Sequence, residues 1–155
     1  MHIAFATHED TRQLSTLLST LFAQEADFVP NEDKQTAGLS QIIANADVGQ
    51  ILVCRHEAGS AILGMVSLLY TVSTARGGRV AFLEDMIVAP QHRGQGVGTR
   101  LLAAAIDHAR DAGCLRITLL TDHDNQEAMH FYRRHGFSAS AMTPMRLMLE
   151  TDTTD

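Results

Sequence analysis

Two adjacent carboxylates, Glu84 and Asp85, interrupt an otherwise apolar run from Phe82 to Val88. Burying a charge in a central strand is costly without a partner. Such an acid is explained either by proton transfer, since a carboxylate is a common general base, or by a structural ion pair with an arginine. Neighbouring strand residues point to opposite faces, so at most one of the two acids faces a given pocket unless a bulge shifts the alternation.

A glycine-rich turn follows this run, with glycines at positions 94, 96 and 98. Glycine allows close approach of the backbone to a ligand, and the N–H groups at the start of the helix expected next suit a phosphate. The P-loop pattern fails because no lysine precedes Thr99, and the third glycine of the dinucleotide pattern would fall at Thr99 itself. The pattern Arg93-x-x-Gly96-x-Gly98 remains, as a phosphate cradle or as an ordinary strand-to-helix connection.

A second motif lies about 30 residues further on and reads Asn125-x-x-Ala128-x-x-Phe131-Tyr132-x-x-x-Gly136-Phe137. The Tyr132 phenol is a candidate general acid, although an aromatic residue beside Phe131 is also typical of a packed helix face. Asn125 is typical of a helix N-cap, a role compatible with binding a ligand.

The apolar periodicity predicts alternating strands and helices around these motifs. Strands are expected at His2–Ala6, Gln50–His56, Ala61–Thr74, Arg79–Val88 and Leu115–Thr121. Helices are expected from Thr7 to before Pro30, at Asp33–Asn45, after Gly98 as far as Gly113, and at Gln126–His135. Residues 138–150 are expected to supply two short strands, the last at Met145–Leu149. Three consecutive strands should form an antiparallel meander, and Leu115–Thr121 should lie parallel to its last member.

Length and composition favour one cytoplasmic domain. The chain has 155 residues, 45% of them apolar, and a net charge of −6, which argues against a nucleic-acid partner. We expect no signal peptide and no membrane-spanning segment. The two cysteines, Cys54 and Cys114, are expected to be buried thiols in a reducing compartment, and neither is favoured as a nucleophile. The histidine spacing does not match a zinc site, so no metal is expected.

The two motifs, in this order and separation, resemble those of the GNAT superfamily of acyl-CoA-dependent N-acyltransferases. The string Phe82-Leu83-Glu84-Asp85 is also similar to that of diamine and polyamine acetyltransferases. The resemblance implies an α/β (α+β) three-layer fold, in which about four helices flank a mixed, mostly antiparallel sheet of six to seven strands with splayed central strands. It implies a single N-acetyltransferase domain over residues 1–150, followed by a polar tail at 151–155.

The resemblance also implies how acetyl-CoA would bind as cosubstrate. Pantetheine would pair with the backbone at Met86, Ile87 and Val88. The pyrophosphate would lie on the turn, and Asn125 and Tyr132 would complete the site. The turn residues concerned are Arg93, Gly94, Gln95, Gly96, Val97, Gly98 and Thr99.

For catalysis, the resemblance favours Glu84 as general base and Tyr132 as general acid, with a backbone N–H near Met86 holding the carbonyl oxygen. Asp85 is then more readily explained as a structural ion-pair partner. The expected reaction is direct transfer of acetyl from acetyl-CoA to a primary amine.

The amine acceptor is the least defined part of this interpretation. The acidic balance weakly favours a small cationic amine, while the acids at positions 25, 27, 32 and 33 are more typical of a solvated loop than of a binding rim. Alternatives are a protein N-terminal or lysine acetyltransferase, a catalytically weak acyl-CoA-binding sensor of the same fold, and a nucleotide-binding module. Homodimers are common in such families, so a homodimer is one expected state.

Overall fold

A computed structural model of the chain describes residues 1–25 and 28–150. The chain divides into two compact units, Met1–Asp122 and His123–Asp155, and each is described by itself. The single domain expected over residues 1–150 therefore remains a prediction, and the expected polar tail at 151–155 lies outside the described residues.

The first unit is built on a five-stranded sheet with the order β1-β2-β3-β4-β5. Its strands are β1 His2–Phe5, β2 Gly49–Arg55, β3 Ile62–Ser73, β4 Gly78–Val88 and β5 Ile117–Leu119. The expected meander is confirmed, because β2, β3 and β4 pair antiparallel, with β1 antiparallel on the outer edge of β2. The expected parallel pairing of β5 with β4 is also confirmed.

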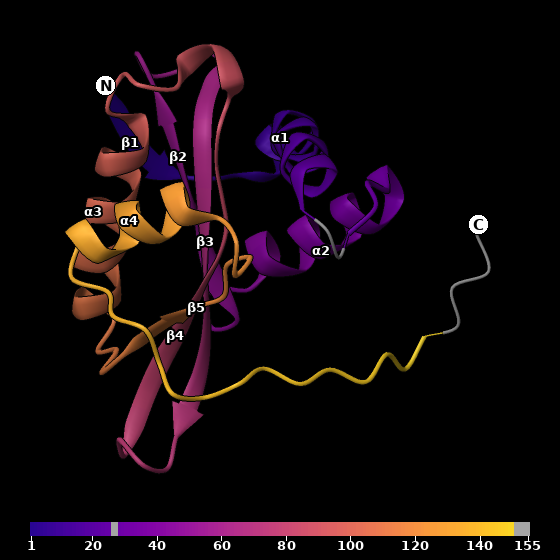
Figure 1. Ribbon diagram of the computed structural model, residues 1–155. Coiled ribbons are helices and arrows are strands. Elements are labelled where there is room, and N and C mark those ends of the chain that lie inside the picture. Colours follow the sequence, from indigo (N-terminus) through magenta and orange to yellow (C-terminus); the bar gives the residue numbers. More distant parts are fainter. Residues whose placement is uncertain (26–27, 151–155) are drawn as a thin grey trace. The chain divides into compact units, whose positions relative to one another are not determined.

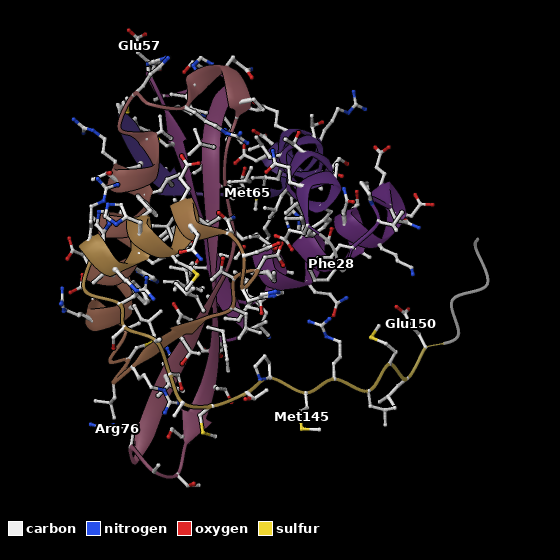
Figure 2. The ribbon with its side chains drawn as sticks, viewed as in Figure 1. Phe28, Glu57, Met65, Arg76, Met145 and Glu150 are labelled. Carbon is white, nitrogen blue, oxygen red and sulfur yellow. The ribbon has the colours of Figure 1, made fainter. Side chains whose placement is uncertain are left out.

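Helices cover both faces of this sheet (Figure 1). Helices α1 Thr11–Gln24 and α2 Glu32–Ala44 lie on one face, and α3 Val97–Asp111 lies on the other. Met65 of β3 is fully buried within the α1–α2 side of the core (Figure 2). The buried members of that cluster are Leu14, Leu17, Leu18, Leu39, Ile51, Val53, Ile62, Met65, Ile87 and Ala89.

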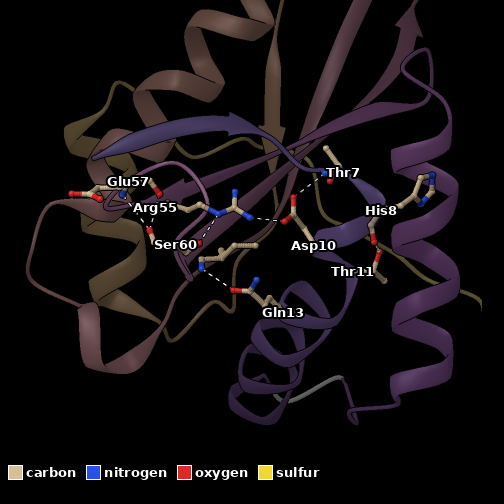
Figure 3. Close-up of polar contacts among 9 residues, drawn as sticks. Thr7, His8, Asp10, Thr11, Gln13, Arg55, Glu57 and Ser60 are labelled. Carbon is tan, nitrogen blue, oxygen red and sulfur yellow. Dashed lines mark hydrogen bonds and ion pairs between the residues drawn. The ribbon is translucent and has the colours of Figure 1, made fainter.

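A largely buried ion pair anchors the start of α1 to the sheet (Figure 3). Asp10, at the end of the short 3-10 helix η1 His8–Asp10, accepts hydrogen bonds from the Thr7 backbone N–H at 2.9 Å and from Arg55 Nη2 at 2.5 Å. Arg55 Nε also donates to the Ser60 carbonyl at 2.8 Å. One guanidinium therefore ties together β2, the hairpin that follows it and the first helical turn of the chain.

The second unit contains α4 Gln126–Arg134, and the residues from 138 to 150 are extended without strand pairing. The prediction of six to seven strands is therefore wrong for the described part of the chain, where five are present. Alternating apolar residues predicted a strand at Met145–Leu149, but a strand also needs a partner edge, which a local pattern does not specify. Figure 1 shows this stretch as a continuous extended ribbon.

Two further boundaries differ from expectation. The helix α3 begins at Val97, so Gly98 lies inside its first turn, because Gly96 already supplies the left-handed residue before the helix. The strand β5 has only three residues, Ile117–Leu119, instead of the seven expected at Leu115–Thr121, although the Leu115 N–H still donates to the Arg79 carbonyl of β4 at 2.9 Å.

Replacing Arg55 by alanine should lower the free energy of unfolding by about 3 kcal/mol, because it leaves the Asp10 carboxylate buried without its partner. Arg110→Ala is the matched control, since it breaks the exposed pair with Asp107 and should change stability by less than about 1 kcal/mol. Urea unfolding followed by circular dichroism measures both. Equal losses in the two variants would contradict the anchoring role of Arg55.

Candidate active site

A β-bulge at Asp85 is the central feature of β4. Glu84 pairs with Ser67 and Ile87 with Met65, so two residues of β4 lie opposite one residue of β3. Asp85 has φ of +52°, the only positive φ of a non-glycine residue among those described. One inserted residue reverses the alternation of the strand from this point on.

The bulge decides which backbone groups of β4 face the outer edge. Before it, the Ala81 N–H points to β5, where it donates to the Arg116 carbonyl at 3.0 Å. After it, the Ala89 N–H points to β3 and donates to the Leu63 carbonyl at 2.8 Å. By alternation, Met86 and Val88 then direct their N–H groups away from β3. An unbulged strand would have turned both of them toward β3.

The edge of β4 reached by Met86 and Val88 is open among the described strands. The parallel partner β5 ends at Leu119, which pairs with Leu83, three residues before Met86. An unpaired stretch of strand edge can accept an extended ligand as an added strand. The expected opening between the central strands is thus produced by the early end of β5.

The glycine turn continues from this edge. After the 3-10 helix η2 Pro90–His92, Gly94 and Gly96 adopt φ of +76° and +84°. A methyl group added at either position would meet no atom of the described residues within 4 Å beyond its chain neighbours, so the backbone at both glycines is open to a ligand. The first-turn N–H groups of α3 face this space, and that turn contains no acidic residue. The turn is therefore suited to an anion such as a pyrophosphate.

Packing holds the start of α3 against the strands. The Val97 side chain is buried, and a Cβ added at Gly64 would come within 3.1 Å of it and 2.9 Å of the Ile87 carbonyl. Only glycine at position 64 therefore allows this approach. Arg93 folds back instead, with Nε donating to the Val88 carbonyl at 3.4 Å. Gln95 and Thr99 are exposed on the same turn.

Asp85 has an unusual electrostatic environment. Burial, followed by the negative charges of Glu84 and Glu25, raises the pKa of Asp85 from 3.8 to about 7. Among the described residues, no hydrogen bond or ion pair to its carboxylate is found, so the arginine partner expected from the sequence does not account for it. Glu84 is more exposed, and its register partner Ser67 carries a buried hydroxyl without a hydrogen-bond partner in the described structure.

In the second unit, Asn125 caps α4 by accepting a hydrogen bond from the Ala128 N–H at 3.1 Å. The Tyr132 ring packs edge-on against Phe131 and Phe137, at centroid distances of 5.3 and 5.7 Å. The predicted N-cap is thus confirmed. The proposed contacts of Asn125 and Tyr132 with the coenzyme remain predictions, because this unit is described by itself.

The structure gives less support to a cysteine nucleophile or to a metal site in the described residues. Burial raises the pKa values of the Cys54 and Cys114 thiols, which disfavours either cysteine as a nucleophile. Within residues 1–25 and 28–150, no group of three His, Cys, Asp or Glu side chains is arranged to hold a metal ion. No helix in those ranges is long and apolar enough to cross a membrane.

Comparison with known proteins identifies the family. The model of the acetyltransferase (GNAT) family matches residues 14–137. This chain belongs to the GNAT acetyltransferase family. It is 30% identical over 135 residues to the aminoalkylphosphonate N-acetyltransferase of Salmonella typhimurium, covering 87% of this chain and 83% of that one. The chain is therefore an N-acetyltransferase.

Solved GNAT structures have the same fold. An acetyltransferase from Trypanosoma brucei is 26% identical, with a TM-score of 0.74 and coverage of 96% of this chain and 99% of that one. A predicted acetyltransferase from Clostridium acetobutylicum, solved with acetyl-CoA, also has a TM-score of 0.74. It is 17% identical and covers 96% of each chain, so it supports the fold alone.

The sequence favours a structural role for Asp85, whereas in the structure Asp85, at the bulge, is the acid of the pair whose pKa is raised by its surroundings. The sequence allows a bulge in this strand, but no local pattern specifies its position. The adjacent pair of acids was the available signal, since two neighbouring carboxylates in an apolar strand raise each other's pKa.

Ionisation of Asp85 should destabilise this enzyme. The folded chain keeps the Asp85 proton up to about pH 7 and the unfolded chain only up to 3.8, so the free energy of unfolding falls as pH rises between these values. Asp85→Asn should therefore be more stable than wild type above pH 7, by as much as about 4 kcal/mol, with the difference vanishing below pH 3.8. Urea unfolding at several pH values measures this. The exposed Asp47→Asn should differ by less than about 0.5 kcal/mol; an equal gain in both variants would contradict the prediction.

Proposed function

We propose that this enzyme transfers the acetyl group of acetyl-CoA to the primary amine of a small cationic acceptor, with Asp85 as the general base. The observation that carries the proposal is the Asp85 carboxyl. It lies on a bulge beside an open strand edge, and its pKa is raised to about 7. A general base is most effective when its pKa is close to the working pH.

The residues of the first unit fit acetyl-CoA. The N–H groups of Met86 and Val88 on the open edge of β4 can pair with the two amides of pantetheine. The turn from Gly94 to Thr99 offers free space and helix N–H groups for the pyrophosphate. We assign Arg93 a peripheral role, since its guanidinium contacts the Val88 carbonyl. When bound, acetyl-CoA supplies an acetyl group activated as a thioester.

Asp85 would prepare the acceptor for attack. An alkyl amine has a pKa near ~10.4, so only about one molecule in 10³ is neutral at pH 7. In the proposed reaction a C–N bond forms as the C–S bond breaks, and Asp85 takes the proton that the amine loses. A backbone N–H near Met86 would stabilise the carbonyl oxygen as negative charge develops on it.

Tyr132 would act on the leaving thiolate rather than on the attacking amine. Its phenol can give a proton to the departing thiolate, or stabilise it by a hydrogen bond. Support for this role is the family motif around Asn125 and Tyr132, which falls within the matched residues 14–137. Asn125 would contact the coenzyme while it caps α4.

We expect a cationic acceptor because the acids near the bulge all carry negative charge when they are ionised. The charges of Glu84 and Glu25 are close enough to raise the pKa of Asp85, and a cationic acceptor would offset their mutual repulsion. The unpartnered hydroxyl of Ser67, opposite Glu84 in the sheet, adds a polar group to the same region. The Salmonella relative is named for an aminoalkylphosphonate, which supports a small molecule as the acceptor.

Gly96→Ala should weaken CoA binding at least tenfold, because its methyl group would enter the space proposed for the pyrophosphate. Gly59→Ala is a matched control, with a φ of +83° against +84° and equally open surroundings, but in a hairpin. Both variants should lose about 1 kcal/mol of stability. Calorimetric titration with CoA measures the difference; unchanged affinity in Gly96→Ala would contradict the cradle.

The pH dependence of kcat/KM tests the base. With acetyl-CoA and a panel of small diamines and monoamines, wild-type activity should fall about tenfold per pH unit below about pH 7. Asp85→Asn should lose at least about 100-fold and also lose this dependence. Because Asp85→Asn is expected to be more stable than wild type, unfolding would not explain the loss.

The variant Glu84→Gln tests which of the two adjacent acids, Glu84 or Asp85, is the general base. Removing the neighbouring charge should move the midpoint of the pH profile downward and leave the maximal rate within about tenfold of wild type. Loss of activity in Glu84→Gln with full activity in Asp85→Asn would instead identify Glu84 as the base.

A further inference from the structure

One buried hydroxyl of β3 lies next to the bulge without a hydrogen-bond partner. Ser67 has 0% of its surface exposed, and within residues 1–25 and 28–150 its Oγ makes no hydrogen bond. A buried polar group without a partner destabilises a folded protein, and native structures pair nearly all such groups. The Ser67 hydroxyl therefore points to an acceptor that can reach it from a neighbouring side chain.

The register of the sheet identifies the neighbours of this hydroxyl. Ser67 pairs with Ile51 of β2 on one side and with Glu84 of β4 on the other, and directly opposed residues of antiparallel strands share a face. Along β3, Met65 and Leu69 lie on the same face. Ile51 and Leu69 have no polar side-chain atom, and the Met65 thioether is only a weak acceptor. Among these neighbours, Glu84 is the one with a strong acceptor.

The Glu84 carboxylate can be brought to the Ser67 hydroxyl by a change of rotamer. Glu84 is exposed, so its side chain can move without displacing packed atoms. Directly opposed residues have Cβ atoms roughly 4.5–5.5 Å apart, a separation that these two side chains can bridge with a hydrogen bond. The hydroxyl hydrogen rotates to suit its acceptor, and a bond to a carboxylate is charge-assisted.

We propose that Ser67 is a positioning residue, whose hydroxyl donates a hydrogen bond to the ionised Glu84 carboxylate and holds that charge beside Asp85. The inference rests on the proposed function, in which Asp85 is the base. Besides burial, the charges of Glu84, on the same strand, and of Glu25, at the end of α1, raise the pKa of Asp85. Without the hydrogen bond, the Glu84 carboxylate would spend more time in solvent, farther from Asp85.

A double-mutant cycle in urea unfolding tests the hydrogen bond without any substrate. Ser67→Ala, Glu84→Ala and the double variant are compared with wild type at pH 8. The effects of the two substitutions on the equilibrium constant for unfolding should be coupled by at least about fivefold, because hydrogen bonds to charged groups are stronger than those between neutral groups. Additive effects would overturn the proposal.

Ser15→Ala is the matched control for the cycle. Ser15 is also buried, but it lies in α1 and its hydroxyl accepts a hydrogen bond from Gln35 Nε2 at 3.1 Å. Ser15→Ala should lower the urea midpoint and show no coupling to Glu84→Ala. Equal coupling of both serines to Glu84→Ala would overturn the proposal, because it would show that the coupling does not come from a direct contact.

The pH profile of kcat/KM distinguishes positioning from a purely structural role. Ser67→Ala should move its midpoint downward by roughly 0.5 pH unit, because the Glu84 charge then acts on Asp85 from farther away. No further movement is expected in the Glu84→Ala background, and none in Ser15→Ala. An unchanged or raised midpoint in Ser67→Ala would overturn the positioning role. Full activity of Asp85→Asn would instead overturn the proposed function, while the urea cycle would still decide whether Ser67 and Glu84 are bonded.

Discussion

A single inserted residue in β4 controls the geometry of the candidate active site. Before Asp85, β4 pairs with a neighbouring strand on each of its two edges. After Asp85, the alternation of its backbone N–H groups is reversed. That reversal turns the N–H groups of Met86 and Val88 to the edge that β5 leaves open, while Ile87 keeps its side chain in the core. The core on one side and a ligand-accepting edge on the other thus depend on the same bulge.

The start of α3 reinforces this arrangement from the opposite face. Glycine at position 64 lets Val97 and the carbonyl of Ile87 approach β3 more closely than a Cβ would allow. The helix is therefore held at a fixed height above the strands, and its N-terminal N–H groups are presented next to the open edge. Close packing, rather than any one side chain, therefore positions the helix start and the strand edge that are proposed to hold acetyl-CoA.

The electrostatic environment at the bulge destabilises the folded protein when Asp85 is ionised. Asp85 is partly buried near two other acids, so its charged form is disfavoured by its surroundings. A carboxyl in this state is a poor structural element but a good proton acceptor near neutral pH. The contrast with Asp10 is instructive, because that buried acid has the Arg55 guanidinium and a backbone N–H beside it. Asp10 is the more buried of the two acids, yet it is the one whose surroundings supply partners for its charge.

The sequence predicted the meander, the parallel strand and the glycine turn, because each has a local pattern of periodicity or backbone freedom. It did not place the bulge, since the pairing of β3 with β4 depends on the whole sheet. The preference for Glu84 over Asp85 as the base came from the family resemblance and stays a prediction beside the proposal made for Asp85. Two strands expected at residues 138–150 are absent from the described structure, because alternation indicates a strand but does not supply its partner. The sequence contains the acids of this region, but it does not indicate that Glu25 lies close enough to Asp85 to raise its pKa.

The left-handed backbone at Asp85 also limits which residues evolution can place there. Aspartate, asparagine and glycine tolerate a positive φ more readily than residues with longer or branched side chains. Among the acids, this favours aspartate over glutamate at position 85. A lineage that retained the bulge could therefore lose the carboxylate by drifting to asparagine or glycine without disturbing the fold. With Asp85 as the proposed base, relatives with asparagine or glycine here would be expected to have moved their proton acceptor to another strand or to have given up acetyl transfer.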